Sequence, residues 1–280
     1  MRCLFATDLH GIVGRYRKLL VAIRDERPRV VLLGGDLLPH RAHGPDGEDF
    51  IRSLGIELGL LRRELTPSYP RVLLILGNDD AGAYESTVIA GQEQGLWEYV
   101  HMRRNEIDDH DFYGYACVPP TPFTLKDWER YDVSRFVDPG CVSPEDGFLS
   151  APLDPDVPRN GTIAADLARL VGDDDLTQAV FLFHCPPYGT CLDRAALDGK
   201  LVDHVPVDVH VGSIAIRRLI DERQPLLTLH GHVHESTRLT SAWRDRIGRT
   251  HCFQGAHDGP ELALVHFDTD RLEDARRELL

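Results

Sequence analysis

Short apolar runs recur along the chain, and most of them end in a polar turn that leads into a stretch with helical spacing. The runs that predict strands are Arg2–Thr7, Val30–Leu33, Arg71–Leu76, Glu98–Arg103, Asp111–Val118, Ala179–Phe183, Pro225–Leu229, Thr250–Gln254 and Glu261–Phe267. Apolar residues three and four positions apart predict helices over Arg15–Arg27, Phe50–Leu65, Ile163–Val171 and Ile214–Glu222. This alternation of strand, turn and helix is typical of an α/β protein with a largely parallel sheet.

The stretch from Val30 to Leu38 is the most informative of these runs. Its continuous apolar residues predict a strand that is buried on both faces. Two glycines then allow a tight turn and a close approach of other groups, and Asp36 follows them. Open α/β sheets bind ligands at the carboxyl ends of their strands, so Asp36 is a candidate for chemistry. Taken alone, it would more often be a residue that only caps the next turn.

Residues 119–158 show little periodicity and are rich in Pro, Asp and aromatic residues. A segment of this length is either a functional insertion or a flexible cover over a site. There is no internal repeat, so we expect one domain that spans residues 1–280. A charged tail is expected after Phe267.

Composition narrows the possible partners. The apolar share of 42% supports a full core, and no apolar run approaches the ~18 residues that span a bilayer. The net charge of −14 would repel extended nucleic acid. Six scattered cysteines and the absence of a signal-peptide pattern predict reduced thiols and a cytoplasmic protein without a membrane anchor.

Polar clusters stand at the carboxyl ends of five predicted strands. They are Asp8-Leu9-His10, Gly35-Asp36, Gly77-Asn78-Asp79, His184 and Gly231-His232-Val233-His234. Imidazole and carboxylate groups are ligands of zinc, manganese and iron, whereas an amide oxygen favours harder ions. A single histidine at such a place is more often structural, but five clusters in one context favour a metal site.

The ordered series Asp-x-His, Gly-Asp, Gly-Asn, His and Gly-His-x-His resembles the calcineurin-like metallophosphoesterase family. The segments His184–Thr190, His210–Ser213 and Gly231–Ser236 resemble a prokaryotic branch of that family that is sometimes called Icc-like. The resemblance implies a four-layer α/β/β/α sandwich, in which two mixed sheets are flanked by helices. It also implies hydrolysis of a small phosphorylated substrate by a hydroxide that bridges two divalent metal ions.

Carried over position by position, the resemblance implies two metal sites that share Asp36. The first metal would be held by Asp8, His10, Asp36 and His234, and the second by Asp36, Asn78, His184 and His232. Mn²⁺ is the expected ion for this donor set, with Fe, Zn, Ni and Mg as further options. Two such ions would attract a phosphate despite the acidic chain.

Position 79 departs from the family pattern, which places a histidine directly after the asparagine. Asp79 would repel a phosphoryl group and is a poor general acid at neutral pH. This favours phosphodiesters, which carry less charge than monoesters. Asp79 could instead orient a ligand histidine or a metal-bound water.

The missing proton could come from His210, which precedes a predicted helix together with Ser213. That helix start, with Arg217 one turn later, could bind an anion, although a structural cap by Ser213 is at least as expected. His40 and His43 could also reach the site but are better explained as solvated loop residues.

A phosphodiesterase is the leading interpretation. A nucleotide pyrophosphatase or phosphomonoesterase is the alternative within enzymes, and a non-catalytic binding module on the same fold is the alternative outside them. The absence of a histidine at position 79 favours the binding module, whereas the presence of every expected metal ligand favours the enzyme.

Overall fold

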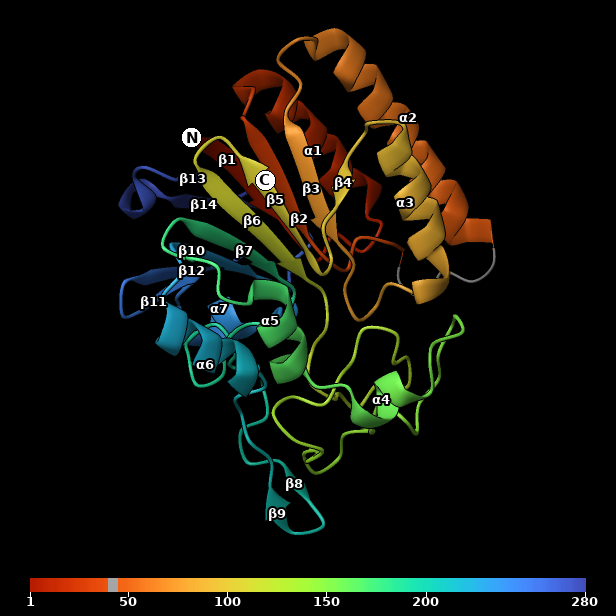
Figure 1. Cartoon of the computed structure of the whole chain (residues 1–280), viewed down its shortest axis with the longest axis vertical. Helices are drawn as coiled ribbons and strands as arrows, with labels where there is room; N and C mark the ends of the chain where they lie inside the picture. Colours follow the sequence, from red (N-terminus) through yellow and green to blue (C-terminus); the bar gives the residue numbers. More distant parts are fainter. Residues whose placement is uncertain (40–44) are drawn as a thin grey trace.

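The computed structural model describes residues 1–39 and 45–280. Two six-stranded sheets face each other, with helices against both outer faces (Figure 1). The first sheet has the order β14-β13-β1-β2-β3-β4 and the second the order β11-β12-β10-β7-β6-β5. This arrangement confirms the predicted α/β/β/α sandwich.

The first sheet is parallel from β1 to the edge strand β4, with antiparallel pairing only at its β13–β14 edge, and the second sheet has a parallel centre with an antiparallel strand at each edge. The strands of the first sheet are β1 (Arg2–Ala6), β2 (Val30–Gly34), β3 (Arg71–Ile75), β4 (Glu98–Tyr99), β13 (Ala263–Asp268) and β14 (Arg276–Leu279). Those of the second are β5 (Arg103–Ile107), β6 (His110–Tyr115), β7 (Ala179–Phe183), β10 (Leu227–His230), β11 (Arg244–Ile247) and β12 (Thr250–Gln254). Every residue of β2 and of β7 is buried, as the continuous apolar runs predict.

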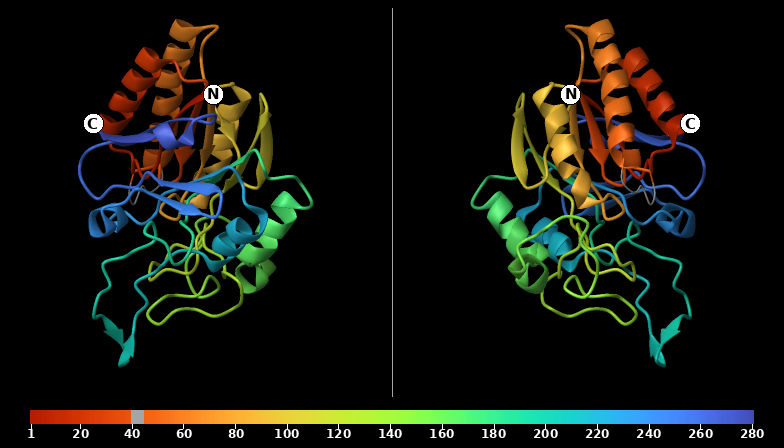
Figure 2. Two further views of the ribbon diagram at one scale, coloured as in Figure 1. Left: turned by 90° about the vertical axis from the view of Figure 1, so that its left-hand side faces the viewer. Right: turned by 90° about the vertical axis from the view of Figure 1, so that its right-hand side faces the viewer.

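Helices cover the outer faces of the two sheets (Figures 1 and 2). The first sheet carries α1 (Val13–Glu26), α2 (Pro45–Leu65) and α3 (Glu85–Glu93), and the second carries α5 (Ile163–Val171) and α6 (Ile214–Arg223). The short helices α4 (Asp156–Asn160) and α7 (Ser236–Thr240) lie in connecting segments. In the part of the chain that the structure describes, no helix has both the length and the apolar composition that a bilayer span requires.

Two predictions of local structure were wrong. The predicted single strand Glu98–Arg103 is divided, because the chain crosses here from the first sheet to the second. Met102 takes a left-handed φ of 54° at this crossing and donates its N–H to Gly114. The predicted charged tail instead ends in β14, whose charged side chains suit an edge strand that pairs with β13.

Two segments extend beyond the carboxyl ends of the parallel strands. Residues 119–158 form an ordered cover, and residues 191–211 include a hairpin of β8 (Leu201–Val202) and β9 (Val205–Pro206). Figure 1 shows both segments below the sheets, on the side where β2, β3 and β7 end. The fold therefore covers the predicted ligand loops with these two segments.

Candidate metal centre

The predicted metal ligands come together where strands of both sheets end. Backbone hydrogen bonds join the loops within each sheet: Asp8 N–H donates to Gly35 O, and Gly231 N–H donates to His184 O. Between the sheets, the N–H of His232 donates to the Asp8 carboxylate, with 3.1 Å from N to Oδ1. The loops are thus fixed to one another by the backbone as well as by the side chains.

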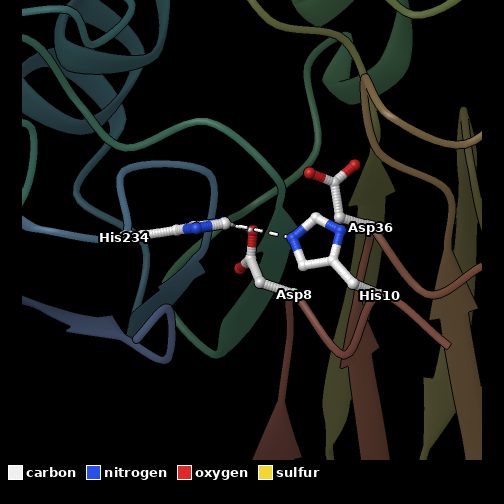
Figure 3. A group of neighbouring side chains, drawn as sticks. All are labelled: Asp8, His10, Asp36 and His234. Carbon is white, nitrogen blue, oxygen red and sulfur yellow. Dashed lines mark hydrogen bonds and ion pairs between the residues drawn. The ribbon is translucent and has the colours of Figure 1, made fainter. Parts of the chain in front are cut away.

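Four of the predicted ligands form one close group. Asp8, His10, Asp36 and His234 each offer an atom, and these atoms lie within 4.8 Å of one another. The distance from His234 Nε2 to Asp8 Oδ1 is 3.0 Å, and that from His10 Nε2 to His234 Nε2 is 3.3 Å. Figure 3 shows His10 and His234 on either side of Asp8. The group matches the ligand set expected for the first metal.

The remaining predicted ligands gather around His184, which is fully buried. His184 Nε2 lies 3.0 Å from Asn78 Oδ1 and 3.3 Å from Asp36 Oδ2. The ring of His232 packs against it at a centroid distance of 5.3 Å. His184 Nδ1 donates to Gly34 O over 2.8 Å, which leaves Nε2 as the nitrogen that can bind a cation. Asp36 therefore belongs to both groups.

An unusual backbone conformation accompanies four of these side chains. Asp8, His10, Asp36 and His232 have φ values of 55°, 47°, 50° and 69°. Residues other than glycine rarely adopt this left-handed region, and such strain is concentrated at functional sites. The conformation turns the chain sharply after each strand.

Glycines permit the close approach of these loops. A Cβ on Gly35, whose φ is 96°, would lie 2.7 Å from His184 Nδ1. A Cβ on Gly77 would collide with the carboxylate and the backbone N of Asp36. Both glycines are therefore required by the packing of the candidate ligands.

Asp80 contributes to the centre although its sequence position gave no sign of this. It is fully buried and accepts the N–H groups of Leu37, Leu38 and Gly77 at 2.8–3.0 Å. Its carboxylate therefore fixes the loop after β2 to the loop after β3. The only sequence feature that could have indicated this role is its position beside Asp79 in a Gly-Asn-Asp-Asp turn.

The electrostatics of the site suit cations. Burial disfavours both charges, yet His184 holds the pKa of Asp36 below its usual value, and Asp36 raises the pKa of His184 to about 10. Burial and the neighbouring His184 lower the pKa of His232 to about 4, so that its imidazole is neutral, as a metal ligand must be. Despite burial, Asp8 raises the pKa of His234 to about 9, so a cation would have to displace a proton from His184 and from His234. Once these protons are displaced, two buried carboxylates, imidazole nitrogens and an amide oxygen form a donor set that fits divalent cations.

Asp79 lies at the margin of the centre. Its N–H donates to Asp36 Oδ1 over 2.8 Å, and its Oδ2 is 3.8 Å from His10 Nδ1. The side chain is 26% exposed. A carboxylate beside a candidate ligand histidine fits the orienting role better than that of a proton donor.

His210 lines a pocket together with His232. Its Nδ1 lies 2.8 Å from Oδ1 of the fully buried Asp193, which also accepts the N–H groups of Gly189 and Thr190. Asp193 was not predicted from the sequence, because nothing in its local pattern shows that it positions a histidine 17 residues away.

The expected alternative for the start of α6 is confirmed: Ser213 is its N-cap and accepts from Ile216 N–H. Asp132 accepts the N–H groups of Ile214 and Ala215, so a side chain already occupies this helix start. Arg217 pairs with Asp221. The helix start is therefore not an anion site. His40 and His43 lie outside the described residues.

Comparisons with known proteins agree with this geometry. A model of the calcineurin-like phosphoesterase family matches residues 1–236, and a comparison with curated proteins finds no match. The structure of TT1561 from Thermus thermophilus has a TM-score of 0.60 and 16% identity, and the match covers 99% of this chain and 98% of that chain. A dimetal phosphatase from Danio rerio has a TM-score of 0.52 and 12% identity, with 100% and 95% covered. At these identities the similarity shows a shared fold.

Proposed function

Because the chain belongs to the calcineurin-like phosphoesterase family, we propose that it is a phosphodiesterase that uses two divalent cations. The observation that carries this proposal is the convergence of the expected ligands from five loops at one edge of the sandwich. Asp8, His10, Asp36 and His234 would hold one cation, and Asp36, Asn78, His184 and His232 the other. Bound cations supply Lewis acidity toward the phosphoryl group and activate water for attack.

Asp79 supports the preference for a diester. Its carboxylate lies beside His10 at the margin of the site, where it opposes the approach of a doubly charged phosphoryl group. A diester carries one charge less and is repelled less. Because its Oδ2 lies 3.8 Å from His10 Nδ1, Asp79 would also stabilise the orientation of a proposed ligand electrostatically.

His210 is the proposed proton donor to the leaving oxygen. The buried Asp193 fixes Nδ1, which leaves Nε2 for this exchange. A carboxylate that orients a histidine is a common arrangement for general acid–base catalysis.

The test compares para-nitrophenyl phosphate with bis(para-nitrophenyl) phosphate on the manganese-loaded protein. We expect a kcat/KM for the diester that is at least about tenfold higher, which corresponds to about 1.4 kcal/mol. Asp79→His should narrow this ratio, whereas Asp109→His, at an exposed turn, should leave it unchanged. Faster hydrolysis of the monoester by the wild-type protein would refute the preference.

Asn78→Ala separates the enzyme from a binding module. The amide oxygen of Asn78 is a proposed ligand, so its loss should lower both the manganese content and the turnover. If wild type and Asn78→Ala show the same residual turnover, the protein is not a catalyst.

A further inference from the structure

A pocket of about 520 Å³ lies beside the candidate metal centre. One wall is the cover, through residues 120–123 and 138–141. The opposite wall is the segment from Ala195 to Val211, which includes the β8–β9 hairpin, and His232 and Val233 also line the pocket. Figures 1 and 2 show the cover and the hairpin on the same side of the sheets. The pocket thus continues directly from a loop that carries two of the candidate ligands.

The cover wall is fixed by a buried ion pair. Lys126 and Glu129 are fully buried and paired, and both bind Thr121, which lines the pocket. Lys126 Nζ donates to Thr121 O over 2.9 Å, and Thr121 donates its N–H and Oγ1–H to Glu129. Trp128 Nε1 donates to Asp80 O over 2.8 Å. The wall is therefore anchored to the same loop that holds Asn78 and Asp79.

The opposite wall is fixed by Asp193. Its carboxylate accepts the N–H of Gly212 and binds Nδ1 of His210. The N–H of Val211 donates to Asp193 O, and the N–H of Ser213 donates to Pro186 O. Asp208, which lines the pocket, accepts the hydroxyl of Tyr188 over 2.7 Å. Hydrogen bonds thus fix both walls before any ligand binds, as is usual for sites that bind small molecules.

The lining is mainly apolar. Its apolar side chains include Pro122, Phe123, Leu197, Leu201, Val202 and Val207. Phe123 is 57% exposed and Leu201 is 60% exposed, so both present apolar surface that a ligand could cover. A volume of this size accommodates an aromatic ring or a comparable organic group.

The charged groups of the lining are mostly acidic. They comprise the carboxylates of Asp138, Asp208 and Glu235 against the single ammonium of Lys200. Asp138 and Asp208 lie close enough to interact electrostatically. With His210 protonated as proposed, three carboxylates still outnumber two cationic side chains, so a second phosphate placed beside Asp138 and Asp208, away from the candidate metal centre, would be repelled, whereas a neutral substituent would not.

We propose that this pocket binds an uncharged, apolar organic substituent of the phosphodiester and selects against a substituent that bears a second phosphate. The inference rests on the proposed function, because the phosphoryl group is placed at the candidate metal centre. It favours aryl or alkyl diesters as substrates and disfavours nucleoside polyphosphates and other pyrophosphates.

The test measures calorimetric binding of three diesters to the manganese-loaded protein. These are dimethyl phosphate, benzyl methyl phosphate and para-phosphonobenzyl methyl phosphate, which differ only in the group meant for the pocket. Burial of a phenyl ring predicts that the benzyl diester binds about tenfold or more tightly than dimethyl phosphate. The para-phosphonobenzyl diester should not bind more tightly than dimethyl phosphate, because its phosphonate group faces the carboxylates of the pocket.

Matched variants locate the effect. Phe123→Ala should remove most of the benzyl advantage and leave the binding of dimethyl phosphate unchanged. Phe136→Ala is the control, because Phe136 is 69% exposed in the same cover but does not line the pocket. Asp138→Asn should strengthen binding of the phosphonobenzyl diester alone.

Equal affinities for the benzyl and dimethyl compounds would overturn the assignment of the pocket, as would equal losses in the two Phe variants or tightest binding of the phosphonate. Binding with the expected preference but without hydrolysis of any diester would support the pocket and refute the proposed activity. Hydrolysis without any preference would support the activity and overturn the pocket.

Discussion

Buried carboxylates organise the candidate centre, and they do so in two ways. Asp8 and Asp36 face histidines and are proposed to bind cations. Asp80 and Asp193 accept backbone N–H groups from neighbouring loops, so they fix positions rather than bind a metal. An unpaired buried carboxylate is costly, and each of these four has polar partners that offset the cost.

Asp36→Asn should separate metal binding from folding. The amide Oδ1 can still accept the N–H of Asp79, so the loop is retained, but one anionic ligand shared by both proposed cations is lost. We expect a large loss of bound manganese and of turnover in a metal-free protein that still unfolds cooperatively, with a midpoint lowered because His184 loses its buried ionic partner. Elemental analysis and thermal denaturation measure both, with Asp109→Asn as the control. Full metal content in Asp36→Asn would contradict the bridging role.

His210→Gln should reveal a proton donor through its dependence on the leaving group. A para-nitrophenolate ion leaves without protonation, whereas an alkoxide does not. We therefore expect turnover of an alkyl diester to fall about 10²-fold, with little change for bis(para-nitrophenyl) phosphate. His204→Gln, at an exposed hairpin position, should change neither rate. Equal losses for both substrates would indicate a role in binding or packing instead.

The sequence predicted the candidate ligands because their order and their place after apolar strands are local features. Asp80 and Asp193 were missed for a physical reason. Their partners are backbone groups of other loops, which become neighbours only when the chain folds. The sequence around them shows only ordinary acidic turn residues.

At the scale of elements, the cover that residues 119–158 form is hydrogen-bonded to both halves of the sandwich. Asp132 accepts from the start of α6, and Asp127 accepts the N–H of Gly82 over 2.8 Å. Of the two predicted possibilities, a functional insertion agrees better with these contacts than a flexible cover. The sequence could not distinguish these two possibilities. Residues 119–158 are ordered mainly by long-range side-chain contacts and not by regular secondary structure, and such contacts leave no local pattern in the sequence.

Asp132→Ala should destabilise the protein by about 2 kcal/mol, since a cap for two N–H groups of α6 and a partner of the Ser213 hydroxyl are lost together. Urea denaturation of the metal-free protein measures this change. Asp154→Ala is the control, because Asp154 is exposed and bonds within its own segment, to Asp156 N–H. A cost within about 0.5 kcal/mol for both variants would show that the tether contributes little.

For the whole molecule, the candidate centre lies where the two sheets meet. Asp8, Asp36 and Asn78 follow strands of the first sheet, whereas His184, His232 and His234 follow strands of the second. One cluster of buried apolar residues includes side chains from both sheets. One domain over residues 1–280 stays a prediction. The apolar pattern predicted strands that belong to both sheets, whereas the division into two sheets was expected only from the family resemblance. The crossing near Met102 was missed because a turn inside a β-like run has no apolar signature.

Removal of the metal should therefore loosen the sandwich as a whole. A cation that binds only the folded state stabilises it by about 2.7 kcal/mol at about 100 times its Kd. We expect EDTA to lower the thermal midpoint of the manganese-loaded protein. The same treatment should leave Asp36→Asn almost unchanged. An equal shift in both proteins would show that the chelator acts elsewhere.

The left-handed conformations of Asp8, His10, Asp36 and His232 have a consequence for how such a chain can change over generations. Glycine adopts these φ values with little strain, so a mutation to glycine at any of them relaxes the backbone while it deletes a ligand. At Asp8 and Asp36 folding still opposes this change, because the lost carboxylates accept the N–H groups of His232 and Asp79. At His10 and His232 the relief of backbone strain works against retention of the imidazole, which makes these two candidate ligands the ones to compare when lineages with and without the proposed activity are to be told apart.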